Sequence, residues 1–174
     1  MTRRLASTEH GELGRAEREI RARIGERPFD FRAMAAISNI YRAATPMRHH
    51  MEQGVLAARN LSWAAFTVLW VLWIWGEQEP GQLAAETGTT KASLSGVLKT
   101  LEGRGLVVRC AHPADGRRVL LGLSPAGLET IEAVFPRFNA EEAFASSALS
   151  GAEQEQLAHL LRQVTATIDP GAWR

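Results

Sequence analysis

The chain has 174 residues, of which 45% are hydrophobic, and a formal net charge of +1. This length suits one domain with an extension and is enough for a proper buried core. The overall charge is only a weak sign of a nucleic-acid partner, and the single cysteine, Cys110, excludes an internal disulfide and suits a reducing compartment.

Residues 1–28 are a charged N-terminal arm in which arginines and glutamates lie at spacings that allow i, i+4 ion pairs. The pattern predicts a solvated helix or a partly disordered arm rather than a binding site. Pro28 ends it. The first residues lack the apolar segment of a secretory signal, so we expect a cytoplasmic protein.

A long helix is expected from Phe29 to Leu56, with Pro46 kinking or dividing it. Its apolar stripe consists of Met34, Ile37, Ile40, Tyr41, Met47, Met51 and Val55. His49 and His50 are adjacent, so they point about 100° apart, and no cysteine or carboxylate cluster completes a coordination set. We therefore expect partly exposed histidines, with no metal and no cofactor.

The segment from Leu61 to Trp75 has only two polar residues and holds four of the five tryptophans. It is too short for a membrane span, which needs about 20 residues, and a buried helix fits better. One side of this helix carries Trp63, Phe66, Trp70 and Trp73. This side is either a core stripe or a face that lines a ligand pocket.

Two short helices are expected next, separated by a turn at Gly88. The first runs from about Pro80 to Thr87, and Thr89 or Thr90 caps the second, which ends at Gly103–Gly105. The second helix buries a stripe of Leu94, Val97, Leu98 and Leu101. Its outer face is small, hydroxylic or basic and suits a major groove; it holds Ala92, Ser95, Gly96, Lys99, Thr100 and Gly103.

A β-hairpin is expected from Leu106–Cys110 and Val119–Leu123, with a turn signal at Asp115–Gly116. Arg117 and Arg118 beside the turn make a charged tip that suits a narrow minor groove. Positive charge is concentrated in residues 80–127, which carry Lys91, Lys99, Arg104, Arg109, Arg117 and Arg118 against Glu86, Glu102 and Asp115. Such a distribution is the electrostatic footprint of a phosphate-binding surface.

Two helices are expected after the hairpin. Ser124 caps the first, which we expect to be bent or broken near Pro136, and a capping box of Ser150 and Glu153 opens the second. The last helix carries a stripe of Leu157, Leu160, Leu161, Val164 and Ile168. The two helices after the hairpin have more apolar surface than a small domain needs. We therefore expect them to form an antiparallel homodimer contact with the helix that begins at Phe29. A two-fold dimer would match a pseudo-palindromic operator.

These motifs resemble the MarR family of winged-helix transcriptional regulators, over roughly residues 33–167. The matching residues are Leu83–Ala84, Thr87–Gly88, Ser93–Ser95, Leu101–Glu102, Gly105–Val107, Asp115 with Arg117 and Arg118, and Leu123–Gly127. The resemblance implies a mostly α fold with a small β-hairpin wing: a winged helix-turn-helix DNA-binding domain over 61–127 and a helical dimerisation region over 29–60 and 128–174. The chain departs from the family at Ala92 and Gly96, where many relatives have a hydroxyl and a basic residue, respectively. More of the affinity for DNA is therefore expected to come from Lys91, Lys99 and the wing.

The residues expected to meet DNA are Thr89, Thr90, Lys91, Ala92, Ser93, Ser95, Gly96, Lys99, Thr100, Arg117 and Arg118. We expect Asp115 to brace the wing by pairing with one of the two arginines, and the resemblance favours Arg117 for the minor groove. Regulators of this family often hold an aromatic acid or another small molecule between the helices, and the residues expected to line that pocket are Tyr41, Arg42, Arg48, His49, Trp63, Phe66, Trp70 and Trp73. Cys110 is expected to be an ordinary strand residue without redox chemistry.

No serine-hydrolase elbow, phosphate loop or zinc-protease motif occurs, so an enzyme is not expected. Two hypotheses remain. The chain is a dimeric DNA-binding repressor that a small, aromatic ligand releases, or it is a winged-helix protein-interaction module that does not bind DNA. Lys91, Lys99 and the wing arginines favour the first, and retention on duplex DNA that weakens steeply with salt would distinguish the two.

Overall fold

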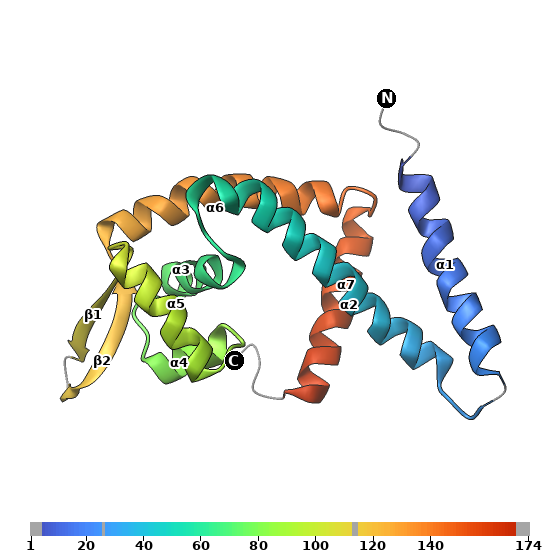
Figure 1. The fold of residues 1–174 in the computed structure, drawn as a ribbon, viewed down its shortest axis with the longest axis horizontal. Coiled ribbons are helices and arrows are strands. Elements are labelled where there is room, and N and C mark those ends of the chain that lie inside the picture. Colours follow the sequence, from blue (N-terminus) through green and yellow to red (C-terminus); the bar gives the residue numbers. More distant parts are fainter. Residues whose placement is uncertain (1–4, 26, 113–114, 170–174) are drawn as a thin grey trace. The chain divides into compact units, whose positions relative to one another are not determined.

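The structure is a computed structural model that describes residues 5–25, 27–112 and 115–169. Parts of the expected arm (1–4 and 26), of the wing (113–114) and of the C-terminal segment (170–174) lie outside these ranges. The described chain is mostly helical and carries one antiparallel hairpin, as expected (Figure 1). It divides into two compact units, Met1–Pro46 and Met47–Arg174.

The first unit pairs helix α1 (Leu5–Ile24) with most of helix α2 (Phe31–Met51). The Asn39 side chain donates a 2.8 Å hydrogen bond to Glu17, and the Arg21 guanidinium lies 5.3 Å from the centroid of the Phe31 ring. On α1 itself, Arg15 and Glu19 form one of the expected i, i+4 ion pairs, at 2.8 Å. Of the two alternatives for the arm, the helix is therefore the one that the structure supports.

Helix α2 continues through Pro46, so of the two expected outcomes, a kink or a division, the division is ruled out. Proline removes one backbone donor from the helix interior, and here the surrounding residues are exposed, so water can satisfy the freed carbonyl. After Met51 the chain continues as a π-helix, η1 (Glu52–Leu56), and a 3-10 turn, η2 (Ala57–Arg59). Asn60 closes this segment in the left-handed conformation, with φ at 51°.

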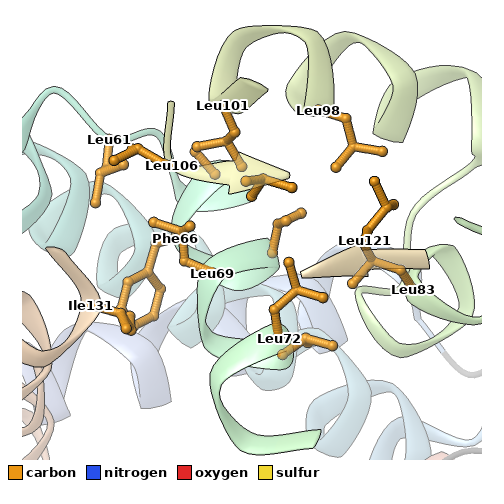
Figure 2. Close-up of a cluster of buried hydrophobic side chains, with 14 of the residues drawn as sticks. Leu61, Phe66, Leu69, Leu72, Leu83, Leu98, Leu101, Leu106, Leu121 and Ile131 are labelled. Atoms are coloured by element: carbon orange, nitrogen blue, oxygen red, sulfur yellow. The ribbon is translucent and has the colours of Figure 1, made fainter. Parts of the chain in front are cut away.

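Helix α3 (Trp63–Trp75) is the centre of the second unit (Figure 2). It packs against α4 (Pro80–Glu86), α5 (Lys91–Gly103), α6 (Pro125–Ala145) and strand β2 (Asp115–Leu123). Its buried residues are Ala65, Phe66, Val68, Leu69, Val71 and Leu72. Because these residues point to more than one side, α3 is the buried helix that the apolar run predicts.

Within the described ranges, no helix taken singly is both long and apolar enough to cross a bilayer. Only the bent succession of Phe31–Arg59 and Trp63–Trp75 reaches that length and composition jointly.

Strand β1 (Val107–His112) pairs with β2 from Val107↔Leu123 to Ala111↔Val119, and an irregularity between Ala111 and His112 precedes the last pair, His112↔Asp115. Both strands therefore extend further toward the tip than expected, and the two wing arginines lie in β2. Gln78 forms an isolated antiparallel bridge with Leu121 of β2. The Gln78 N–H donates to the Leu121 carbonyl at 3.0 Å, and the Leu121 N–H donates to the Gln78 carbonyl at 2.8 Å. The sequence did not predict this bridge, because a single residue has no alternating pattern to detect.

Helix α6 continues through Pro136, so of the expected bend or break, the break is ruled out. Val134 and Phe138, on either side of the proline, are buried, and this packing holds the helix together. Ser124 caps α6, with its hydroxyl accepting a 3.0 Å hydrogen bond from the Gly127 N–H. The last helix, α7 (Gly151–Ile168), opens with the expected capping box of Ser150 and Glu153.

Candidate DNA-binding surface

The connection between α4 and α5 is a tight turn at Gly88, whose φ of 61° is costly for other residues. The Thr89 N–H donates to the Ala84 carbonyl at 3.0 Å, which closes the end of α4. The cap of α5 is Thr90, because its hydroxyl accepts a 3.2 Å hydrogen bond from the Ser93 N–H. The two short helices and their turn thus form the expected helix-turn-helix.

Helix α5 has one buried and one exposed face. Leu98 and Leu101, both labelled in Figure 2, are buried. Leu94 is buried as well, and Val97 is partly buried against the same core. The exposed residues of α5 and its cap are Thr90, Lys91, Ala92, Ser93, Ser95, Gly96, Lys99, Thr100 and Gly103, while Thr89 is half-buried in the turn. All residues that the sequence assigned to the outer face of this helix therefore lie on one accessible surface.

Not every polar group on this surface is free. The Thr90 hydroxyl donates to Ser93 at 3.0 Å, and the Thr100 hydroxyl donates to the Gly96 carbonyl at 3.1 Å. In the described part of the chain, Lys91, Ser95 and Lys99 have no such partner. These three are the side chains of α5 best able to accept a new contact.

The wing differs from expectation in how its charges pair. The Asp115 carboxylate accepts the backbone N–H of Arg117 at 3.0 Å rather than a guanidinium. The Arg118 guanidinium forms an ion pair with Glu79, the residue before α4. Asp115 therefore braces the backbone of β2, and Arg117 has no ion pair among the described residues.

Two further cations of the positive segment are engaged elsewhere. Arg109 lies 2.7 Å from the Glu102 carboxylate. Arg104 donates from both terminal nitrogens, to the carbonyls of Arg59 and Asn60, at 2.8 Å each. No local pattern predicts these partners of Arg104, because they are more than forty residues away. Within the positive segment, Lys91, Lys99 and Arg117 therefore remain as the cations whose side chains have neither an ion pair nor a hydrogen bond among the described residues.

The tryptophan side of α3 packs against phenylalanines of α6. Phe66 and Phe138 stack with centroids 4.1 Å apart, and Trp63 lies 5.9 Å from the same Phe138 ring. Trp73 meets Phe135 at 5.2 Å, and Trp70 meets Trp75 at 5.3 Å. Much of this face is thus part of the core, although Trp63, Trp70 and Trp73 are only half-buried.

The other residues expected at a ligand pocket lie on α2. Tyr41 is 70% exposed and belongs, with Arg42, to the unit Met1–Pro46, whereas Arg48 and His49 are exposed in the second unit. The neighbouring His50 pairs with Glu141 of α6 at 2.7 Å. In the ranges that the structure describes, no group of three or more histidine, cysteine, aspartate or glutamate side chains is placed to hold a metal ion.

Comparisons with known proteins agree with this architecture. The model of the MarR family matches residues 61–119, from the start of the α3 segment into the wing. The uncharacterized HTH-type transcriptional regulator YwaE of Bacillus subtilis is 34% identical, and the match covers 91% of this chain and 94% of YwaE.

Solved structures give the same result. A probable transcriptional regulator from Pseudomonas aeruginosa is 32% identical, with a TM-score of 0.66 over 72% of this chain and 92% of that one. BpsR of Bordetella bronchiseptica, whose DNA binding is regulated by 6-hydroxynicotinic acid, is 26% identical, with a TM-score of 0.68 over 74% of this chain and 91% of BpsR. The chain belongs to the MarR family of winged helix-turn-helix transcriptional regulators.

Proposed function

We propose that this regulator is a homodimeric repressor that binds a pseudo-palindromic operator and leaves it when a small aromatic ligand binds. The observation that carries the dimer is α7, which buries none of its residues and yet exposes an apolar stripe. Leu157, Leu160 and Leu161 are 47%, 46% and 37% exposed. A contiguous apolar stripe of this kind normally marks an interface, and a second copy of the chain offers the same stripe in a self-complementary contact.

A two-fold dimer would present two copies of α5. Two recognition helices related by symmetry read two half-sites about one helical turn apart, so the operator would be a pseudo-palindrome. Lys91, Lys99 and Arg117 would contact phosphates or the minor groove, and Ser95 would face base edges. A protein that acts on chromosomal DNA in this way would work in the cytoplasm.

The ligand part of the proposal is supported by BpsR, whose DNA binding responds to 6-hydroxynicotinic acid, a small aromatic acid. In this chain the half-buried Trp63, Trp70 and Trp73 offer flat apolar surface, and Arg48 and His49 offer groups for a carboxylate. Phe66 is 5% exposed and stacked on Phe138, so a ligand reaches it only if the core rearranges.

The test begins with the full-length protein and fragmented genomic DNA. The fragments that it retains are sequenced, and the affinity for a recovered duplex is measured against salt concentration. We expect a shared pseudo-palindrome and an affinity that falls steeply with salt, because bound lysines and arginines displace counterions from DNA. Absence of enrichment, with no salt-dependent retention on duplex DNA, would favour the protein-interaction module instead.

The dimer is tested separately by sedimentation. Leu160→Glu places a charge in the α7 stripe and should give a monomer that binds the operator poorly. Glu155→Gln, at another exposed position of α7, is the matched control and should leave the dimer intact. A wild-type protein that sediments as a monomer bound to one half-site would overturn the symmetric proposal.

A further inference from the structure

Arg104 lies where the end of the recognition helix meets the end of the segment that follows α2. It is the C-cap residue of α5, and its guanidinium donates to the carbonyls of Arg59 and Asn60 at 2.8 Å each. Both nitrogens are used, one for each carbonyl, in the two-pronged geometry that only arginine provides. The cation therefore bridges two elements that are far apart in the sequence.

The two helix ends that meet there are built in the same way. At the end of α5, Gly105 has φ at 67° and donates to Glu102 at 2.9 Å, while the Leu106 N–H donates to Leu101 at 2.9 Å. This pair of hydrogen bonds is a Schellman motif, with the buried Leu101 and Leu106 as its hydrophobic contact.

The segment Glu52–Asn60 ends with the same pair of bonds. Asn60 has φ at 51° and donates to Ala57 at 3.0 Å, and the Leu61 N–H donates to Leu56 at 3.0 Å. Leu56 and Leu61 are buried. Each helix end presents carbonyls and the negative end of its dipole, and a cation near both is favourable.

The same segment is also tied to α3. The Glu52 carboxylate accepts the N–H of Trp63 at 2.9 Å, at the first turn of α3. Glu52 thus joins the segment Glu52–Asn60 to the core helix α3. Arg104 joins the same segment to the recognition helix α5. The orientation of α5 relative to this segment depends on a pair of exposed, charge-assisted hydrogen bonds rather than on packing alone.

We infer that Arg104 is a positioning residue for operator binding. It fixes the recognition helix α5 to the end of the segment Glu52–Asn60, which follows α2, and does not touch DNA. This inference rests on the proposed function, because the segment Glu52–Asn60 belongs to the dimerisation region expected over residues 29–60 and 128–174. In a symmetric dimer, the link between each α5 and that region sets the distance between the two recognition helices. Arg104 therefore helps to set the half-site spacing that the protein accepts.

The sequence alone suggests a different role for Arg104, as part of the positive footprint for phosphate. The two roles predict different salt behaviour. A mutation that removes a phosphate contact lowers the slope of log affinity against log salt by about one and weakens all sequences evenly. A mutation that removes a positioning interaction weakens the specific complex, leaves the slope unchanged and leaves binding to random duplex almost unaffected.

The experiment uses the full-length chain, a duplex recovered by the wild type from genomic DNA, a random duplex of equal length, and recovered duplexes with one base pair added or removed between the half-sites. For Arg104→Ala we expect about tenfold weaker binding to the recovered duplex, which is 1.4 kcal/mol, with an unchanged salt slope. Adding or removing one base pair between the half-sites should lower the affinity of the wild type, and it should lower the affinity of Arg104→Ala by a smaller factor. Arg104→Lys keeps the charge but not the two-pronged donor, and should behave like the alanine variant in spacing preference.

Lys99→Ala is the matched control, because its expected loss appears in the salt slope and not in the spacing preference. Unfolding by denaturant establishes that each variant is folded, and if Arg104→Ala is not, Arg104→Lys carries the comparison. A salt slope reduced by about one in Arg104→Ala, or operator affinity and spacing preference equal to wild type in a folded Arg104 variant, would overturn the inference. Failure of the wild type to bind any duplex would count against the proposed function instead.

Discussion

The guanidinium of Arg118 in the wing forms an ion pair with the carboxylate of Glu79, the residue before α4. Its neighbour Arg117 is exposed, and its backbone N–H is held by the Asp115 carboxylate at 3.0 Å. Adjacent residues of a strand point to opposite faces, so only one of the two arginines reaches Glu79. Arg118 must therefore break its ion pair with Glu79 before it can contact DNA, whereas Arg117 has no described ion pair to break.

The first prediction compares the two arginines. Arg117→Ala should lower affinity for every duplex and reduce the salt slope by about one, because a free cation is removed. Arg118→Ala should have a smaller effect, because its charge is already offset by Glu79. Affinity measured at several salt concentrations checks both. The control is Glu79→Gln, which should raise affinity by releasing Arg118, and equal losses for the two alanine variants would contradict the assignment.

The second prediction concerns the exposed face of α5. Lys99→Ala should weaken specific and random duplexes to a similar extent and reduce the salt slope by about one, which is the behaviour of a phosphate contact. Ser95→Ala should instead weaken the recovered operator more than random DNA, because a hydroxyl at a base edge carries sequence information. Competition binding with the two kinds of duplex separates these results. Unchanged affinity of Lys99→Ala for all duplexes would mean that α5 does not face DNA as proposed.

Local signals predicted the helix-turn-helix well. The stripe of Leu94, Leu98 and Leu101 is buried, and Ser124 and Ser150 cap the helices that follow them. Each of these features depends on residues within about two helical turns, so spacing along the chain is enough to find it.

The features that the sequence did not predict depend on distant partners or on packing. The carbonyl partners of Arg104 and the bridge from Gln78 to Leu121 join distant parts of the chain. The sequence also left open whether Pro46 and Pro136 would break their helices, and neither does. Proline's cost in a helix, about 3 kcal/mol, is a local quantity, and the packing of the whole helix exceeds it in α6.

The third prediction tests why glycine stands at position 127. A Cβ built on Gly127 would lie 2.0 Å from the carbonyl oxygen of Leu106, so the start of α6 would have to move away from the turn after α5. We expect Gly127→Ala to lower the free energy of unfolding by about 3 kcal/mol, at the upper end of typical overpacking costs. Denaturant unfolding provides the measurement. A loss below about 0.5 kcal/mol, the range of ordinary surface substitutions, would show that the turn adapts freely.

Gly96→Ala is the control for that experiment. Gly96 lies inside α5 with no heavy atom within 4 Å of the added Cβ, and alanine is the better helix former. Unfolding stability should therefore rise by about 1 kcal/mol.

The fourth prediction concerns the pH dependence of α7. The hydroxyl and then the backbone N–H of Ser150 hold the pKa of Glu153 below its ordinary value of 4.5. A carboxyl whose pKa is lowered by folding stabilises the folded state above its unfolded pKa, and this contribution is lost as the pH falls through the lower, folded value. Helicity measured by circular dichroism should decrease below pH 4.5 more in the wild type than in Glu153→Gln, whose side chain does not titrate. Identical acid profiles would show that the capping box does not contribute to α7 in solution.

The last prediction concerns the tryptophans of α3. Trp63, Trp70 and Trp73 are half-buried, whereas Phe66 is stacked between α3 and α6, so a ligand would reach the indoles first. A ligand shifts the equilibrium away from DNA only if it binds the non-binding arrangement more tightly, since equal affinity for both arrangements shifts nothing. Small aromatic carboxylates or phenols should therefore quench tryptophan fluorescence and weaken operator binding over the same concentration range, and Trp63→Ala or Trp70→Ala should reduce both effects. Trp173→Phe removes the one tryptophan outside residues 61–75 of the sequence and serves as the control for fluorescence changes unrelated to release. If a broad panel of such compounds changes neither fluorescence nor DNA affinity, the aromatic face of α3 is core alone and the ligand proposal is abandoned.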